Sequence, residues 1–300
     1  MIIMKYDFEI ERVNAEIKKR KAKRALIQLP EGLKQYAREI IDGINVDCVL
    51  SADACFGACD LMTTPECDVT VHFGHSKMLE DKNVIYVETH SELDVTKVIE
   101  KAIPLLGKRV ALATTAQHLY RLDEMKKTLE RHGKTVVLGK TGLKTKPGQV
   151  LGCDFSSVIN ADADCVLFVG SGRFHPLGVA FFTNKKTIQA DPYSNAVTVI
   201  DASSWEKEKM LRKEKARNAK TFGIIYSQKP GQKNFALAES LKKISDKKCY
   251  LISLNLITPD AVDYLPFDAY VITACPRIVL DDWKNFKKPV LLPDEFKELS

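Results

Sequence analysis

The chain has 300 residues and a net charge of +6, with 45% hydrophobic, 28% charged and 8% aromatic residues. This composition is that of an ordinary globular protein and excludes collagen-like, disordered and coiled-coil chains. The small, evenly spread positive charge does not indicate nucleic-acid binding. No apolar run approaches the roughly 18 residues that cross a bilayer, and charged residues interrupt residues 1–11, unlike those of a signal peptide. We therefore expect a cytoplasmic protein with no membrane partner and with two or three domains.

One pattern of elements occurs three times: a short apolar run, a polar turn, an amphipathic helix and a second apolar run. The first copy is predicted to have a helix at 34–44 and strands at 24–29, 48–52, 68–74 and 84–87. The second has a helix at 122–132 and strands at 109–115, 135–139, 164–170 and 187–190. The third has a helix at 234–245 and strands at 222–226, 250–254, 268–274 and 289–292. Short β-branched runs that alternate with helical periods indicate βαβ units on parallel sheets.

The third strand of each copy opens with an aspartate, and Asp68, Asp164 and Asp268 can be placed in register. We therefore predict three α/β domains of one topology, at residues 1–105, 106–215 and 216–300. A single large doubly wound sheet is the alternative. The charge-rich stretches 11–24 and 206–220 are predicted to be helices with solvated faces.

The chain contains eight cysteines but no Cys-x2-Cys pair, which argues against zinc ribbons and local ferredoxin loops. A reducing compartment makes a disulfide framework unexpected. Four cysteines lie at the start or in the interior of predicted strands, or just before one, and are interpreted as buried thiols: Cys48, Cys67, Cys165 and Cys249.

Three other cysteines, one from each copy, lie on the carboxyl side of a predicted strand: Cys59, Cys153 and Cys275. Ligands of parallel α/β sheets bind at this edge. Three converging thiolates suit a [4Fe–4S] cluster with one open iron, and zinc with an exchangeable fourth ligand is the alternative. The spacing of the three cysteines does not decide between these metals. The role of Cys55, which lies close to Cys59 in the sequence, stays open.

Four stretches together resemble the family of archaeal 2-(3-amino-3-carboxypropyl)histidine synthases, which catalyse the first step of diphthamide biosynthesis. These stretches are Ala54–Asp60, Gly148–Asp154, Gly170–Pro176 and Thr273–Arg277. They occur in the order found in the family, and the resemblance extends from about residue 25 to residue 293. Each stretch alone would be weak evidence, but the four together are highly specific.

The resemblance implies a homodimer in which three similar α/β domains surround a central [4Fe–4S] cluster with pseudo-three-fold symmetry, held by Cys59, Cys153 and Cys275. It also implies a non-standard radical reaction of S-adenosylmethionine that needs an electron donor. The Cγ–S bond breaks, methylthioadenosine is released, and a 3-amino-3-carboxypropyl radical attaches to C2 of a histidine of translation elongation factor 2. The Cys-x3-Cys-x2-Cys signature of ordinary radical enzymes is absent from the sequence, in agreement with this chemistry.

Further residues at strand ends are candidates for binding S-adenosylmethionine. Gly170, Gly172 and Arg173 form a glycine-rich turn that suits the substrate carboxylate. We expect no helix to open there, so the turn is not interpreted as a dinucleotide fingerprint. Three more candidates stand at other strand ends: His75 for the adenosine or the target histidine, Gln228 for a ligand contact, and Tyr193 for stacking on adenine.

Two other functions are compatible with three cysteines on three α/β domains. A quinolinate synthase-like dehydratase would use a similar open-iron cluster. A non-catalytic assembly protein that binds zinc or a cluster would not turn over S-adenosylmethionine.

Overall fold

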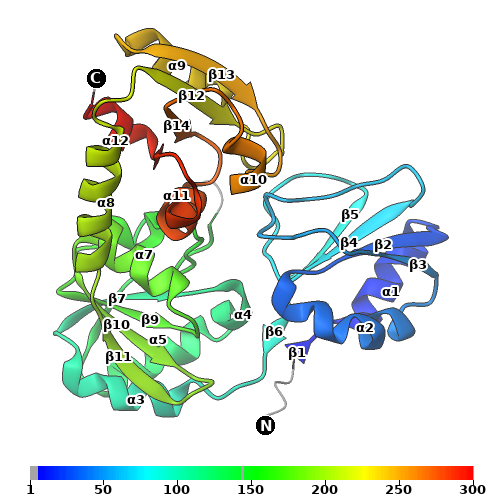
Figure 1. Cartoon of the computed structure of the whole chain (residues 1–300). Helices are drawn as coiled ribbons and strands as arrows, with labels where there is room; N and C mark the ends of the chain where they lie inside the picture. Colours follow the sequence, from blue (N-terminus) through cyan, green and yellow to red (C-terminus); the bar gives the residue numbers. More distant parts are fainter. Residues whose placement is uncertain (1–5, 143–144, 300) are drawn as a thin grey trace. The chain divides into compact units, whose positions relative to one another are not determined.

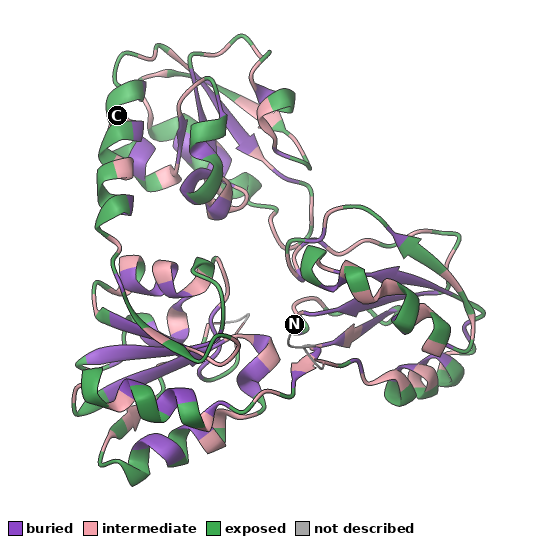
Figure 2. Ribbon diagram, turned by 60° about the horizontal axis from the view of Figure 1, so that its bottom comes forward, coloured by how far each residue is buried: buried purple, intermediate pink, exposed green. Residues whose placement is uncertain are grey.

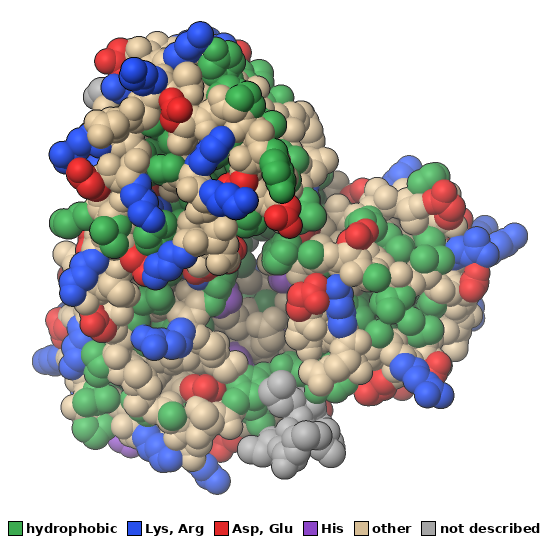
Figure 3. Space-filling model, in the orientation of Figure 1, with side chains coloured by type: hydrophobic (Ala, Val, Ile, Leu, Met, Phe, Trp, Pro, Cys, Tyr) green, Lys and Arg blue, Asp and Glu red, His purple; other side chains and the backbone are tan. Residues whose placement is uncertain are grey.

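The computed structural model describes residues 6–142 and 145–299 and divides them between two compact units, Met1–Asp201 and Ala202–Ser300 (Figure 1). Parallel sheets form the cores of both units, which confirms the predicted α/β class. The central strands of the sheets are buried, whereas the helices expose their outer faces (Figure 2). None of the helices in the described residues is long and apolar enough to cross a bilayer. On the face drawn in Figure 3, Lys and Arg side chains are interspersed with acidic ones.

The first sheet has the strand order β3-β2-β4-β5, and all its neighbouring strands are parallel. Its strands are β2 (Arg24–Gln28), β3 (Asp47–Ser51), β4 (Val69–Phe73) and β5 (Val84–Val87). The helical elements of this region are α1 (Ile10–Lys19), η1 (Glu31–Tyr36) and α2 (Ala37–Gly43), and the short strands β1 (Tyr6–Asp7) and β6 (His90–Ser91) pair with each other. All five residues of β4 are buried, as expected for a central parallel strand.

The second sheet, in the same unit, has the order β11-β10-β9-β7-β8. Its strands are β7 (Arg109–Thr114), β8 (Thr135–Val137), β9 (Cys165–Val169), β10 (Lys186–Asp191) and β11 (Ala196–Ile200). Its helical elements are α3 (Thr96–Ala102), η2 (Ile103–Leu105), α4 (Ala116–Leu119), α5 (Leu122–Arg131), α6 (Ser156–Ile159) and α7 (Phe174–Thr183). The pairing of β10 with β11 is antiparallel, whereas the other pairings are parallel.

The second unit contains the third sheet, in the order β13-β12-β14-β15. Its strands are β12 (Thr221–Tyr226), β13 (Lys248–Ser253), β14 (Ala269–Ile272) and β15 (Val290–Leu291). Its helical elements are α8 (Ser203–Ala216), α9 (Phe235–Ile244), α10 (Pro259–Val262), α11 (Pro276–Asp282), η3 (Trp283–Asn285) and α12 (Pro293–Lys297).

The three sheets share one topology, because in each the second strand pairs with the first, the first with the third and the third with the fourth. The three aspartates placed in register by the sequence make equivalent contacts. Oδ2 of Asp68 accepts hydrogen bonds from the backbone of Lys23 and Arg24, at 2.7 and 3.0 Å. Asp164 and Asp268 likewise accept backbone N–H groups where β7 and β12 begin. The strands themselves begin one residue after each aspartate.

The unit boundary differs from the predicted domain boundary at 215/216. Helix α8 belongs to the second unit and packs against β15 and α12. The prediction assigned 203–215 to the second domain. The division into three domains stays a prediction. The division between the two units places the boundary between the second and third domains near residue 201.

Three local predictions were wrong. A helix, α7, does open after the glycine-rich turn, and Pro176 is tolerated there because it lies in the first turn. Helix α8 is not simply solvated, since it buries Trp205, Arg212 and Ala216. Cys48 and Cys67 are half-buried rather than buried, because Cys48 lies on the edge strand β3 and Cys67 lies outside the sheet.

The buried contact of α8 is an ion pair. The guanidinium of Arg212 bonds both carboxylate oxygens of Glu295, at 3.2 and 2.5 Å, and the two side chains are 1% and 2% exposed. Glu295 also accepts the backbone N–H of Leu292, at 3.0 Å. The pair therefore joins α8 to the start of α12 within the second unit.

Replacing Arg212 with Ala should lower the free energy of unfolding by about 3–5 kcal/mol, because the Glu295 carboxylate is left buried without its cation. Denaturant titration measures this loss. The matched control is Arg217→Ala, which removes an exposed ion pair with Glu214 and should change stability by no more than about 0.5 kcal/mol. Equal losses in the two variants would contradict the assignment. The double variant Arg212→Met/Glu295→Leu should recover most of the loss.

Candidate functional site

Cys59 lies in the loop that follows β3, at the carboxyl edge of the first sheet. The ammonium of Lys34 holds the start of this loop by bonds to the carbonyls of Ala52 and Asp53, at 3.0 and 3.1 Å. A turn closes around the cysteine, with the N–H of Asp60 donating to the carbonyl of Gly57 at 2.9 Å. The Cys59 side chain is half-buried, whereas that of Cys55 is buried.

A buried polar chain ties this loop to the neighbouring strand β4. Gln28 and His72 are paired across β2 and β4. Gln28 Nε2 donates to the carbonyl of Asp60 at 2.7 Å, and Gln28 Oε1 accepts the N–H of Met62 at 3.1 Å. Oε1 also lies 2.8 Å from His72 Nδ1, and His72 Nε2 lies 2.9 Å from Nδ1 of His75.

These contacts assign the tautomers of both histidines. The two backbone partners of Gln28 fix its amide orientation, so its Oε1 must accept a hydrogen bond from His72 Nδ1. The other nitrogen of a neutral His72 then accepts from Nδ1–H of His75. The lone pair of His75 is therefore left on Nε2.

Burial keeps both imidazoles neutral. It lowers the pKa of His72 to about 3, with the charge of His75 adding to the effect. It also lowers the pKa of His75 to about 4, although the Asp60 carboxylate acts in the opposite direction. The folded chain therefore offers His75 Nε2 as a neutral acceptor throughout the physiological pH range.

The segment that carries His75 is also held from the second sheet. Gly74 has φ +82°, and a Cβ there would come within 2.8 Å of Pro30, so only glycine fits. Its carbonyl accepts Nε2 of Gln117, at 2.9 Å. Nε2 of Gln149 donates to the hydroxyl of Ser76, at 2.8 Å. Gln117 on helix α4 and Gln149 in the loop that follows β8 thus hold the residues on either side of His75.

Cys153 lies in the loop whose earlier part contains Gln149. Thr114, the last residue of β7, exchanges backbone bonds with Gly148 and Val150, at 2.8 and 3.0 Å. Leu151 and Asp154 close the turn around the cysteine, with N–H of Leu151 donating to the carbonyl of Asp154 at 2.9 Å. Cys153 is exposed. The loop, which follows β8 in the sequence, is therefore anchored at the carboxyl end of β7.

Cys275 lies in the second unit, three residues after the end of β14 and directly before α11. It is half-buried. Next to it, Arg277 bonds Asp281 at 2.7 Å and lies over the ring of Trp205 at 5.1 Å. Burial lowers the pKa of this guanidinium, against the opposite effect of the Asp281 carboxylate. Each predicted cysteine thus follows a strand of a different sheet at its carboxyl side.

The glycine-rich turn joins β9 to α7. Gly170 and Gly172 have φ values of +153° and +73°. Gln189 on β10 donates to both of their carbonyls, at 2.9 and 3.0 Å. Arg173 is exposed and stands at the N-cap position of the ten-residue helix α7, without a side-chain capping hydrogen bond. The turn thus places a guanidinium beside a helix N-terminus, where anions are stabilised.

The other two candidates have protein partners. The hydroxyl of Tyr193 lies 3.2 Å from that of Tyr6, and its ring meets the ring of His118 edge-on. Gln228 is exposed, and its Nε2 donates to Ser253 at 3.3 Å. His75, Arg173 and Tyr193 share one unit with Cys59 and Cys153, and Gln228 shares the other with Cys275.

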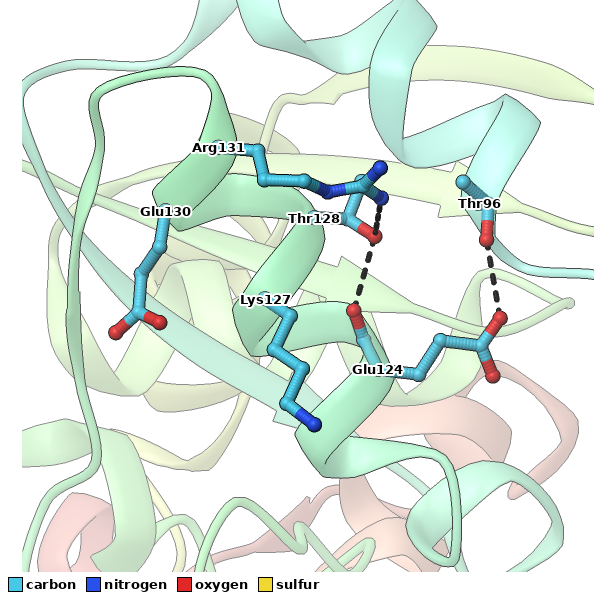
Figure 4. A pocket seen from close by; sticks show the side chains of 6 residues that line it. All are labelled: Thr96, Glu124, Lys127, Thr128, Glu130 and Arg131. Atoms are coloured by element: carbon cyan, nitrogen blue, oxygen red, sulfur yellow. Dashed lines mark hydrogen bonds between the residues drawn. The ribbon is translucent and has the colours of Figure 1, made fainter.

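A surface hollow lies away from these residues (Figure 4). Charged and hydroxyl side chains of α5 and the first residue of α3 line it: Thr96, Glu124, Lys127, Thr128, Glu130 and Arg131. Its hydrogen bonds join these groups to one another, as in the 3.0 Å bond from Thr96 to Glu124. It contains none of the predicted site residues.

The sequence did not single out Gln28, His72 or Gln149. Their contacts depend on strand register and on loops from two sheets. One signal was present, since Gln28 and His72 are polar residues within otherwise apolar predicted strands, and buried polar groups need partners.

Nitrogen NMR should find both His72 and His75 neutral, with the proton on Nδ1, and neither should titrate above about pH 5. Gln28→Leu removes the acceptor that fixes the His72 tautomer, so His72 should then populate both tautomers. The exposed His132 serves as an internal control, whose spectrum the substitution should leave unchanged. A protonated Nε2 on His75 in the unsubstituted, metal-free chain would contradict the assigned chain of bonds.

Comparison with known proteins adds independent evidence. The family model for the diphthamide synthesis protein matches residues 29–299. The chain is 38% identical to 2-(3-amino-3-carboxypropyl)histidine synthase of Pyrococcus horikoshii, over 95% of this chain and 87% of the relative. It is 31% identical to the enzyme of the same name from Methanocaldococcus jannaschii, over 97% and 89% of the two chains.

Solved structures agree with the sequence comparisons. The crystal structure of Dph2 from Pyrococcus horikoshii matches with a TM-score of 0.90 and 35% identity, over 99% of this chain and 91% of that one. The structure of the same protein with a 4Fe–4S cluster matches with a TM-score of 0.89 and 34% identity, over the same shares. Together with the family match, these likenesses establish that the chain belongs to the diphthamide synthesis protein family.

Proposed function

We propose that this chain is a 2-(3-amino-3-carboxypropyl)histidine synthase, which transfers an aminocarboxypropyl group from S-adenosylmethionine to a histidine of translation elongation factor 2. Family membership supports this activity. One observation in the chain carries it: each of three sheets with the same strand order is followed, at its carboxyl side, by one accessible or half-buried cysteine. The family assignment favours this transferase over the dehydratase and the assembly protein.

The three cysteines fit a [4Fe–4S] cluster by their chemistry. Thiolates are the usual ligands of such clusters, and Cys59, Cys153 and Cys275 have accessible side chains on loops anchored to strand ends. Cys165 and Cys249, by contrast, are buried at the amino ends of their strands. A related protein with a 4Fe–4S cluster has the same fold. We therefore propose these three as the cluster ligands.

When bound, a reduced cluster supplies the single electron that breaks the Cγ–S bond of S-adenosylmethionine. The protein groups then have the task of positioning the substrate. Arg173, beside the N-terminus of α7, suits the carboxylate of the methionine moiety. The N–H of Gly170 donates to the carbonyl of Ala190 at 3.0 Å. The N–H groups of Ser171 and Gly172 suit the same anion, because Gln189 holds the carbonyls of the turn.

His75 provides a different kind of contact. Its Nε2 is a neutral acceptor, and we propose that it accepts a hydrogen bond from an N–H group of the adenosine or of the incoming histidine. Tyr193 and Gln228 are retained as proposed contacts to S-adenosylmethionine. Homodimer formation, a central pseudo-three-fold arrangement, an electron donor and a cytoplasmic location are likewise proposals that follow from the resemblance.

Anaerobic reconstitution followed by a coupled assay tests the function. With dithionite and S-adenosylmethionine, the chain should release methylthioadenosine, and mass spectrometry should find an aminocarboxypropyl group on the histidine of elongation factor 2. Cys275→Ala should lose bound iron and both products, whereas the half-buried Cys67→Ala should retain them. A full iron content in Cys275→Ala would remove it from the ligand set. Intact cluster without methylthioadenosine would contradict the proposed activity.

Arg173→Ala should weaken binding of S-adenosylmethionine by about 10- to 100-fold, because a charge-assisted bond to the carboxylate is lost. Equilibrium dialysis with the cluster-loaded chain measures this change, and iron content should stay the same. Lys186→Ala is the matched control. Lys186 is an exposed cation at the amino end of β10, whereas the glycine-rich turn contacts the carboxyl end of that strand. Unaltered affinity in Arg173→Ala would exclude this residue from the substrate site.

A further inference from the structure

Cys55, His72 and His75 form a cluster of potential metal ligands that the proposed reaction does not use as a set. One ligand atom from each residue lies within 4.8 Å of the others. The side chain of Cys55 is 2% exposed and that of His72 is 0% exposed, while His75 is half-buried. A sulfur and two imidazole nitrogens are a donor set that zinc and similar divalent cations bind.

The surroundings of His72 match those of a histidine that binds a metal. Such a histidine usually donates its second ring N–H to a fixed oxygen, which orients the ring and leaves the other nitrogen for the ion. Here Nδ1 of His72 donates to Gln28 Oε1 at 2.8 Å, and Gln28 is itself held by the backbone of Asp60 and Met62. His72 Nε2 therefore has its lone pair on the side of His75.

The charge balance also favours a cation. The carboxylate of Asp60 is buried and interacts electrostatically with both Cys55 and His75. Burial and the neighbouring negative charge of Asp60 both disfavour a thiolate at this position, so the Cys55 thiol stays protonated when no metal is bound. A divalent cation would offset both charges.

We propose that Cys55 Sγ, His72 Nε2 and His75 Nδ1 bind a divalent cation of the zinc class, with a fourth position open to water. Metal binding changes the protonation of two of the three ligands. Cys55 releases its thiol proton to solvent, and the proton of His75 moves from Nδ1 to Nε2 as Nδ1 binds the ion. His72 keeps its proton on Nδ1.

The two imidazole nitrogens require only a small movement to bind one ion. His72 Nε2 and His75 Nδ1 are now 2.9 Å apart, and two nitrogens bound to tetrahedral zinc are about 3.4 Å apart. The site is distinct from the proposed cluster ligands, because none of its three donors belongs to that set. It follows from the geometry of this chain and not from the proposed function.

Zinc and cobalt binding test the proposal in the full chain. After the cluster has been reconstituted, dialysis against zinc should leave about one zinc ion per chain, measured by mass spectrometry of the metals. In the variant Cys59→Ala/Cys153→Ala/Cys275→Ala, which lacks the proposed cluster ligands, Co²⁺ should produce a near-ultraviolet thiolate-to-cobalt band. Zinc should abolish that band by displacement.

Three further substitutions test the proposed site. Adding Cys55→Ala should abolish the thiolate band and the bound zinc, whereas Cys48→Ala, which removes a half-buried thiol of the same sheet, should change neither. Gln28→Leu should weaken binding by about 10- to 100-fold, because the ring of His72 loses its orienting partner. Thermal melts show that each variant is folded. Equal zinc binding with and without Cys55, or cobalt binding without a thiolate band, would overturn the proposal.

Discussion

Parallel strand pairing in a single order, repeated in three sheets, is the constraint on which the other features of this chain depend. In each sheet the first strand lies between the second and the third. An aspartate at the start of the third strand accepts backbone N–H groups at the start of the first, which fixes the register of the two strands. Because parallel strands end at the same edge, the following loops are brought together there. The proposed site residues lie on these loops.

The same constraint gives each copy a different side chain at one equivalent position. Seven residues after the register aspartate stand His75 in the first copy, Ser171 in the second and Cys275 in the third. The equivalent backbone position thus carries a hydrogen-bonded imidazole in the first copy, a residue of the glycine-rich turn in the second and a proposed cluster ligand in the third. A repeated fold can therefore carry chemically different side chains on a common backbone.

The polar chain at the edge of the first sheet depends on register in the same way. Pairing of β2 with β4 sets Gln28 beside His72, and the turn at Gly74 sets His75 beside His72. Every member is buried or half-buried and has a hydrogen-bond partner, which is the condition under which a buried polar network is stable and specific. The chain of bonds determines which nitrogen of the neutral His75 carries the proton.

The sequence predicted the strands well, since β-branched runs such as residues 69–73 are typical of buried parallel strands. It missed α7, whose first turn contains Pro176 and whose middle contains Gly178, and it missed β11, which pairs antiparallel in a hairpin. The many lysines and glutamates of α8 led to the prediction of a solvated helix, although one side of the helix is buried. The three cysteines could be selected from strand ends, but their role as a set came from family resemblance. The partners of His72 could not be predicted, because they depend on the exact register of two strands.

The central claim is that three cysteines, one from each repeated sheet, hold a cluster and leave one iron for the substrate. Mössbauer spectroscopy of the chain reconstituted with ⁵⁷Fe tests it most directly. Addition of S-adenosylmethionine should change the spectrum of one iron site and leave the other three unchanged. A spectrum in which all iron sites stay the same, although S-adenosylmethionine is bound, would contradict the account.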